Sequence, residues 1–300
     1  MPRVRYPSAN STAIRSGRVD ADAVVAFAAA TNDANPLYES GAAVPPLFSA
    51  TLVLDSSFNA DRGIDGSPVK VTGARGTVHG EHDVFFHKPL IPEMVVRWNS
   101  STCSAKRSGS GVLVTDRIAI ESVSGELLVE HFWSSFHVGG QIDREIGAPL
   151  PDHRFPEGSR PHPVATKVIP VDRDQAFRYA GVSGDRVGHA IDDEQARADG
   201  YPSKILQGMC TLGMVSGALV DMAAEGDPNK ITRIAVRFSA PTFPRKKLLV
   251  TTYPIDLRQG RHSAGAASGA THPRRALAFE AIQDGVAVIK HGRVELSPSA

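Results

Sequence analysis

The segment of residues 205–220 places the strongest constraint on what this chain can fold into. It reads as a helix that is apolar on almost every face. Its small residues are Gly208, Cys210, Gly213, Ser216, Gly217 and Ala218. A helix without a polar face belongs inside a protein. Glycines weaken an isolated helix, so we expect them to allow close packing against a sheet that wraps this segment.

The residues before this helix deliver an acid and a histidine to its N-terminus. Gly181-Val-Ser-Gly184 predicts a turn that presents Asp185, and His189 follows four residues later. Residues 192–198 predict a short helix, because the acidic first turn suits the helix dipole. Gly200-Tyr-Pro202 ends that helix. A carboxylate and an imidazole close to the start of a buried helix make this segment the candidate reaction centre.

The chain repeats with an offset of 152 residues. Asp33 and Asp185 are separated by this offset, and so are the motifs Phe86-x-x-Pro89-x-x-Pro92 and Phe238-x-x-Pro241-x-x-Pro244. Two distant motifs that share one spacing indicate a tandem duplication. The alternative is that FxxPxxP is only a common pattern at strand ends.

Each half has the same order of predicted elements: a helix, an acid loop, a long buried helix and about four strands. The predicted elements of the first half are helices at 19–30 (with Asp20 as a candidate N-cap) and 45–55, and strands at 83–87, 95–100, 111–122 and 127–138. Those of the second half are a helix at 172–180, the helix described above, and strands at 232–238, 247–253, 276–282 and 286–296. Residues 1–18 read as an irregular lead-in and 260–271 as a hairpin loop. A sheet that follows one apolar helix has to wrap it, so the predicted fold class is α+β, with one sheet continuing across both units.

The domain boundaries follow from this repeat. We predict an N-terminal unit at residues 1–140 and a C-terminal unit at residues 164–300. The linker at 141–163 contains Pro149, Pro151, Pro156, Pro161 and Pro163 and has no periodicity.

Composition excludes several classes of protein. A hydrophobic fraction of 41% and a charged fraction of 22% are typical of a globular protein, and a net charge of +1 does not suggest a nucleic-acid partner. Cys103 and Cys210 are too few for a disulfide framework or a structural zinc site, and the longest apolar run, at 23–30, is too short to span a membrane. His79, His82 and His87 lack an acid cluster at metal-ligand spacing. We therefore expect a cytoplasmic protein without a metal site, a membrane partner or a nucleic-acid partner.

These motifs resemble the MaoC-like, double hot-dog (R)-specific enoyl-CoA hydratases, also called hydratase 2, and related dehydratases. The resemblance covers nearly the whole chain. Ser183-Gly-Asp185 with Asp192 is similar to the family's S-G-D-x-N-P-L-H-x-D, residues 196–200 to A-x-x-x-G, and residues 205–213 to I-L-H-G-L-C-T-x-G. In the first half, residues 33–38, 45–48, 79–81 and 87–90 resemble the family's non-catalytic N-terminal unit.

Two positions depart from the family's pattern. The histidine expected five residues after the aspartate is Ala190, and His189 lies one residue earlier. The histidine expected before the helix glycine is Gln207. His82 and His87, from the predicted strands of the first half, are the next candidates if another histidine supplies the imidazole.

The resemblance implies a double hot-dog fold, in which each antiparallel sheet wraps a long central helix, and reversible hydration of 2-enoyl-CoA in fatty acid metabolism. It implies a catalytic pair of Asp185 and His189, with Gly208, Gln207 and Ser216 as the oxyanion and substrate-binding residues. Hydration of a 2-enoyl thioester has three requirements. A water must lose a proton as its oxygen attacks C3, a proton must reach C2, and the thioester oxygen must be stabilised as it gains charge. Coenzyme A enters only as part of the substrate, no other cofactor is expected, the N-terminal unit shapes the acyl pocket, and the protein is expected to be a homodimer.

Other interpretations of the same residues stay open. Asp185 can serve only to hold a turn, His189 can be a surface-loop histidine, and Gly208 can be a packing glycine. The basic run 245–247 can be a solvated strand edge or can meet the phosphates of coenzyme A. The whole chain can accordingly be a non-catalytic acyl-CoA-binding or scaffold protein of the same fold, or a hot-dog thioesterase.

Overall fold

The computed structural model describes residues 14–54, 69–147, 150–155, 158–255 and 275–298. Within these ranges one ten-stranded antiparallel sheet has the order β1-β3-β4-β5-β2-β7-β10-β9-β8-β6. The strands are β1 (Arg15–Arg18), β2 (Thr77–Phe86), β3 (Val95–Ser108), β4 (Gly111–Ser122), β5 (Leu127–Val138), β6 (Ala165–Pro170), β7 (Ile231–Phe238), β8 (Lys247–Pro254), β9 (Arg275–Gln283) and β10 (Val286–Leu296).

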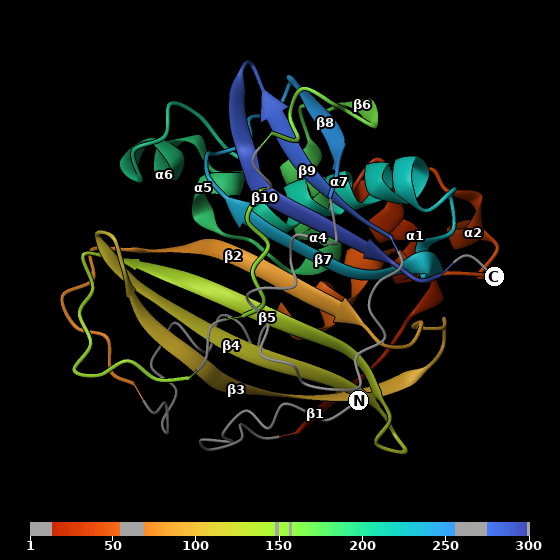
Figure 1. Ribbon diagram of the computed structural model, residues 1–300, viewed down its shortest axis with the longest axis horizontal. Coiled ribbons are helices and arrows are strands. Elements are labelled where there is room, and N and C mark those ends of the chain that lie inside the picture. Colours follow the sequence, from red (N-terminus) through yellow and green to blue (C-terminus); the bar gives the residue numbers. More distant parts are fainter. Residues whose placement is uncertain (1–13, 55–68, 148–149, 156–157, 256–274, 299–300) are drawn as a thin grey trace.

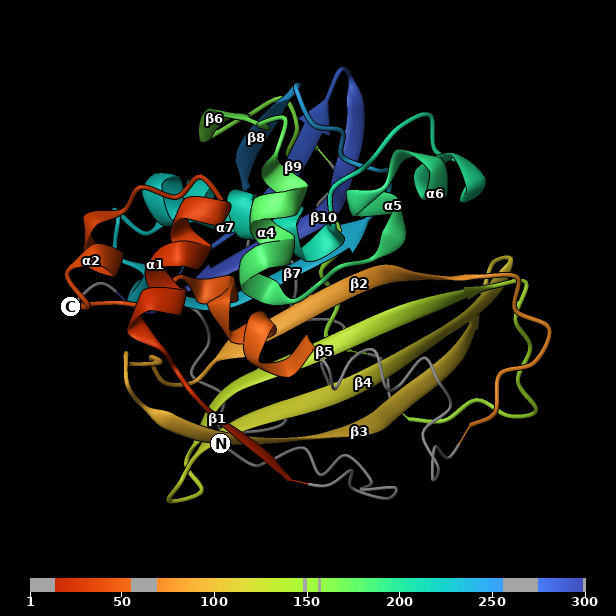
Figure 2. The same ribbon diagram turned by 180° about the vertical axis from the view of Figure 1, so that it is seen from behind.

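The helices gather on one face of this sheet (Figures 1 and 2). They are α1 (Ala21–Ala30), α2 (Pro36–Glu39), α4 (Gln175–Ser183), α5 (Gly188–Ile191), α6 (Asp193–Ala198) and α7 (Gly208–Ala223), with the 3-10 turns η1 (Pro46–Phe48) and η2 (Pro228–Lys230). Residues 49–54 continue from η1 as a helix. Asp20 caps α1 as predicted, because its carboxylate accepts the N–H of Ala23 at 2.8 Å.

The two halves of the sheet repeat each other from the centre outward. The order is β7-β10-β9-β8-β6 on one side and β2-β5-β4-β3-β1 on the other, and β2 pairs with β7 at the seam. β2 and β7 end at Phe86 and Phe238, which lie 152 residues apart. The acid loops also agree, since the N–H of Asn35 donates to Asp33 and that of Val187 to Asp185, both at 3.3 Å. The predicted α+β double hot-dog fold is confirmed, whereas the unit boundaries 1–140 and 164–300 stay a prediction.

Helix α7 forms the centre of the core, as its all-round apolar sequence predicts. It is buried on all faces, and it begins at Gly208, three residues after the start of the apolar run at 205–220. The residues just before it are held by other partners, because the N–H groups of Ile205 and Leu206 donate to the carbonyls of His189 and Thr242 at 3.1 and 2.8 Å. The start of the helix is therefore fixed by tertiary contacts that its own sequence does not reveal.

The glycines of α7 serve close packing, but their neighbours are not the sheet residues that we expected. A Cβ added to Gly213 would lie 2.8 Å from Cγ2 of Thr31, and one added to Gly217 would lie 2.6 Å from Oδ2 of Asp33. Both contacts come from the end of α1 and the acid loop of the first half. The duplicated loop thus packs directly onto the central helix of the second half.

Several sequence-based boundaries are wrong in detail. β1 lies in the predicted lead-in, and β6 was not predicted; both are short edge strands, of four and six residues, whose partners, β3 and β8, are distant in the chain. Residues 181–183 complete α4, and Gly184 ends it in the left-handed conformation with φ of 78°. The hairpin loop predicted at 260–271 and the linker residues Pro149 and Pro156 lie outside the described residues.

A buried ion pair holds the seam between the halves. Arg233 of β7 binds Asp83 of β2 through two hydrogen bonds, at 2.9 and 2.7 Å, and its guanidinium also reaches Glu295 at 3.1 Å. Arg233 and Asp83 are almost fully buried. A buried charge that loses its partner is strongly destabilised, because water cannot replace the lost interaction.

We therefore expect Asp83→Ala to lower the free energy of unfolding by about 3–5 kcal/mol. Glu126→Ala is the matched control, since it removes an exposed pair with Lys88 and should cost less than about 1 kcal/mol. Urea unfolding of both variants measures the difference. Equal losses in the two variants would contradict the importance of the seam.

Candidate active site

The acid loop of the second half presents a buried carboxylate. Gly184 ends α4, and the hydroxyl of Ser183 donates to the carbonyl of Tyr179 at 2.7 Å while it accepts the N–H of Asp185 at 3.1 Å. The Asp185 carboxylate accepts the N–H of Val187. Asp185 is only 7% exposed. The loop therefore holds this carboxylate in one orientation inside the protein.

Burial sets the acidity of Asp185. Desolvation raises the pKa of its carboxyl above the usual value, and the Val187 hydrogen bond and the nearby charge of His189 oppose the rise. A carboxyl with a raised pKa exchanges protons more readily near neutral pH. His189 and Asp185 both contact the segment that leads into α7, because their carbonyls accept from the N–H of Ile205 and from Nε2 of Gln207.

The raised pKa of Asp185 predicts a pH dependence of stability. An acid whose pKa is higher in the folded protein than in the unfolded chain favours folding most at low pH, and this contribution disappears as the pH rises through the folded pKa. Asp185→Asn removes the ionisation, so the variant should unfold with a higher free energy than the wild type at pH 7, by about 1.4 kcal/mol for each unit of the pKa difference. Urea unfolding should show the two proteins converging below pH 4. A variant that is less stable than the wild type at pH 7 would contradict this.

His189 lies in α5, and its ring is held by a residue that our sequence interpretation did not include. Its Nδ1 lies 3.0 Å from Oδ2 of Asp199, and the ring packs edge-on against Tyr201 with centroids 5.4 Å apart. Gly188, directly before His189, allows close packing of Gln195, because a Cβ there would lie 2.5 Å from Cγ of that side chain.

Gln207 joins the acid loop to the start of α7. Its Nε2 donates to the carbonyls of Asp185 and Ala176 at 2.9 and 3.2 Å. Its Oε1 is buried and has no hydrogen-bond partner among the described residues. Gln207, in the position of the family's histidine, thus fixes the backbone of Asp185 beside the helix N-terminus.

Gly208 is the first residue of α7, and neither packing nor backbone conformation requires a glycine there. A Cβ would make only ordinary contacts, at 3.5–3.7 Å, with the ring of Phe238. Gly213 and Gly217, by contrast, have no room for a side chain. The first N–H groups of a helix lack partners within it, so the open position at Gly208 leaves a donor and space beside Phe238.

Ser216 does not meet the catalytic candidates. It is buried two turns into α7, and its hydroxyl donates to the carbonyl of Gly213 at 2.8 Å. No contact recorded for the described residues joins it to Asp185 or His189. The structure therefore brings Asp185, His189, Gln207 and Gly208 to one end of α7 and leaves Ser216 inside the helix packing.

Three histidines of the first half, the fully buried His82 and His131 and the half-buried His79, form a row near this end of α7. Nδ1 of His82 lies 3.3 Å from Nε2 of His79, and its Nε2 lies 3.0 Å from Nδ1 of His131. The ring of His79 packs against the rings of Trp133 and Phe238, with centroids 4.0 and 4.7 Å apart. Burial lowers the pKa of His79 and of His131 to about 3. Imidazoles of such low basicity are poor proton acceptors, so these histidines are weak candidates for acid–base chemistry.

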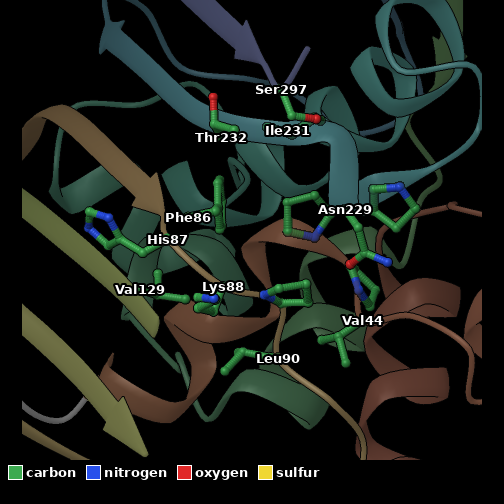
Figure 3. A pocket seen from close by; sticks show the side chains of 14 residues that line it. Val44, Phe86, His87, Lys88, Leu90, Val129, Asn229, Ile231, Thr232 and Ser297 are labelled. Atoms are coloured by element: carbon green, nitrogen blue, oxygen red, sulfur yellow. The ribbon is translucent and has the colours of Figure 1, made fainter. Parts of the chain in front are cut away.

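The other fallback histidine lies at the opposite end of β2. His87 pairs with Glu130 at 2.8 Å and lines a cavity of about 190 Å³ between the end of β2 and the start of β7 (Figure 3). This cavity is the first-half counterpart of the site, with Phe86 in place of Phe238 and Pro46 at the start of the helical segment. Proline has no N–H to donate, and Tyr38 follows Asp33 where the family has its histidine. The first half therefore keeps the architecture without a comparable set of reactive groups.

The basic run 245–247 lies at the start of β8. The amine of Lys246 pairs with Asp284 at 2.7 Å, and both side chains are exposed. This placement agrees with a solvated strand edge. Within the described ranges, no group of His, Cys, Asp and Glu side chains is arranged to hold a metal ion. None of the helices in the described part of the chain is long and apolar enough to cross a membrane.

Fold and site together define a protein of the double hot-dog class, with an acid loop held against the N-terminus of a buried helix. Residues 158–271 match the family described as "MaoC like domain", so this part of the chain is similar to that domain. The resemblance seen in the sequence motifs is thereby confirmed.

The similar proteins agree with this assignment. The chain is 24% identical over 212 residues to "Probable enoyl-CoA hydratase 2" of Dictyostelium discoideum, which covers 70% of this chain and 69% of that protein. It is 30% identical over 177 residues to "Peroxisomal multifunctional enzyme type 2" of Drosophila melanogaster, covering 58% of this chain but only 29% of that protein. Among solved structures, a MaoC-like dehydratase from Phytophthora capsici shares the fold, with a TM-score of 0.78 and 22% identity over 96% of both chains.

Proposed function

We propose that the protein catalyses the reversible hydration of a 2-enoyl-CoA to an (R)-3-hydroxyacyl-CoA. The observation that carries the proposal is the buried carboxylate of Asp185, with its raised pKa, in the neighbourhood of His189 and the open N-terminus of α7. The MaoC-like domain and the hydratase names of the relatives support the same reaction. These names describe the relatives, and an assay of this chain tests the proposal.

Asp185 and His189 work on one water and share one proton. The unprotonated ring nitrogen of His189 takes a proton from the water as its oxygen bonds to C3. In its protonated form, which the raised pKa makes more accessible, the Asp185 carboxyl gives its proton to C2, where the electrons of the double bond arrive through the thioester enolate. The proton then returns from the imidazolium to the carboxylate, and both groups recover their starting states.

The thioester oxygen gains negative charge during this step. The N–H of Gly208, at the positive end of the α7 dipole, is the donor that we assign to it. Gln207 holds the carbonyl of Asp185 and so fixes the acid loop beside this donor. Ser216 contributes through the packing of α7 and not through contact with the reacting atoms.

The remaining expectations belong to this proposal. The reaction moves protons and water without a change in oxidation state, so it requires no redox cofactor, and we propose that coenzyme A enters only with the substrate. The unit at 1–140 would shape the acyl pocket without catalysis. A homodimer and a cytoplasmic location are also expected; three relatives carry the word peroxisomal in their names.

The test follows three products in one reaction. Purified protein is mixed with crotonyl-CoA and with a longer 2-enoyl-CoA, and the loss of enoyl-thioester absorbance, the chirality of the 3-hydroxyacyl product and free thiol are measured together. Loss of absorbance with an (R) product supports the hydratase. Release of thiol without hydration indicates a thioesterase, and binding without turnover indicates the scaffold that the shifted position of His189 would allow.

A further inference from the structure

The ring of His189 is held by a carboxylate other than that of Asp185. Asp199 is the residue directly after α6, and its Oδ2 lies 3.0 Å from Nδ1 of His189. Its other oxygen accepts Nε2–H of Gln195 at 2.7 Å. These two hydrogen bonds, that from Gln195 first, hold the pKa of Asp199 below its usual value. The carboxylate therefore stays ionised and acts as an acceptor toward the ring.

We propose that Asp199 is a positioning residue that orients His189 and selects its reactive tautomer. An ionised carboxylate can only accept, so Nδ1 of the neutral ring must carry the proton that it donates to Asp199. Nε2 is then left with its lone pair, which is the form a base needs, since the hydrogen bond of one ring nitrogen decides the state of the other. The proposal rests on the hydratase function proposed above.

The local packing explains how Asp199 reaches a histidine that is shifted by one residue from the family's position. His189 lies one residue before the family's histidine position, in a single turn of helix α5. Gly188 has no side chain, and this lets Gln195 of α6 approach α5 closely. The approach brings the end of α6, with Asp199, against the shifted ring. Asp199 thereby supplies an anchor for an imidazole that lies out of the family's register.

Other contacts keep α5 and α6 together and mark the surroundings of the ring. Lys204 pairs with Asp193 of α6, and the N–H of Ile205 donates to the carbonyl of His189 at 3.1 Å. The ring itself contacts Asp199 and the edge of Tyr201. Its charge also acts on Asp185, whose pKa it lowers. The side chains of His189 and Asp199 are 27% and 36% exposed, so solvent moderates the strength of their pair.

The test replaces Asp199 by Asn, which keeps the shape of the side chain and removes its charge. An amide can donate to Nδ1, and this favours the tautomer with the proton on Nε2. We expect kcat to fall by about 10- to 100-fold, less than for a fully buried histidine–carboxylate pair, with KM nearly unchanged. Long-range 1H–15N NMR spectra of histidine-labelled protein should show the His189 tautomer with Nδ1–H in the wild type and lose it in Asp199→Asn.

Asp193→Asn is the matched control. It breaks an ion pair of the same helix, with Lys204, without touching His189, and should keep both kcat and the tautomer of the wild type. Asp199→Glu restores the negative charge and should recover part of kcat. If Asp199→Asn keeps the wild-type kcat and tautomer, the proposal is wrong. A wild type that shows the Nδ1–H tautomer but hydrates no 2-enoyl-CoA would overturn the proposed function alone.

Discussion

Asp185→Asn and His189→Ala are each expected to lower kcat/KM for a 2-enoyl-CoA by about 100- to 10,000-fold, the usual loss for one positioned acid–base group. The double variant should be barely worse than either single variant, because groups that act as a unit lose their function together. Steady-state rates of absorbance loss measure all three. The folds should survive, since Asn preserves the acceptor for the N–H of Val187 and the ring of His189 is partly exposed.

The duplication provides the control for this prediction. Asp33 occupies the same turn in the first half, accepts the corresponding N–H at the same distance, and has a pKa that burial raises. Asp33→Asn should therefore leave kcat/KM within about twofold of the wild type, because no histidine accompanies it. If Asp33→Asn and Asp185→Asn lose kcat/KM to a comparable extent, the Asp-to-Asn substitution lowers activity by disturbing the fold and not by removing a catalytic group.

The two single variants can also disagree. If Asp185→Asn is inactive while His189→Ala keeps full activity, the imidazole role belongs to another histidine. The packing of His79 against Phe238 then makes His79, with its partner His82, the next candidate to replace. His87 is excluded from that role, because it pairs with Glu130 at the far end of β2.

Gly208→Val is expected to lower kcat/KM by at least about 100-fold, the loss typical of one oxyanion donor, while the midpoint of thermal unfolding changes little. The structure gives room for a Cβ next to Phe238, so the added side chain fills space outside the packed core. It would occupy the space that the thioester needs at the helix N-terminus. Initial rates and calorimetric binding of an acyl-CoA measure the effect.

Gly213→Ala supplies the opposite pattern. Its Cβ would lie 2.8 Å from Thr31, and overpacking of a buried contact costs about 1–3 kcal/mol. This variant should lose stability and keep most of the activity of its folded fraction. If Gly208→Val binds and hydrates an acyl-CoA as well as the wild type does, the glycine has no role at the thioester.

The sequence by itself determined the class of fold and the elements that carry the candidate site. The all-round apolar helix belongs at the centre of the protein, and the 152-residue offset of Asp33 and Phe86 from Asp185 and Phe238 indicates two equivalent units. Strands such as 111–122 and 286–296 were predicted to the residue, because alternation and turn residues are local signals. Asp185 and Gly208 could be chosen for the same reason, since a short motif carries each of them.

Only the tertiary structure decided which side chains meet. Asp199 is an ordinary helix-end residue in the sequence, and it reaches His189 only because Gly188 lets α6 pack against α5. The edge strands β1 and β6 are short and form because distant strands offer them unpaired backbone groups. The glycines of α7 look alike in the sequence. Residues of the first half nevertheless occupy the space beside Gly213 and Gly217, and they do not occupy the space beside Gly208. Such distinctions depend on contacts between segments far apart in the chain, which no local pattern encodes.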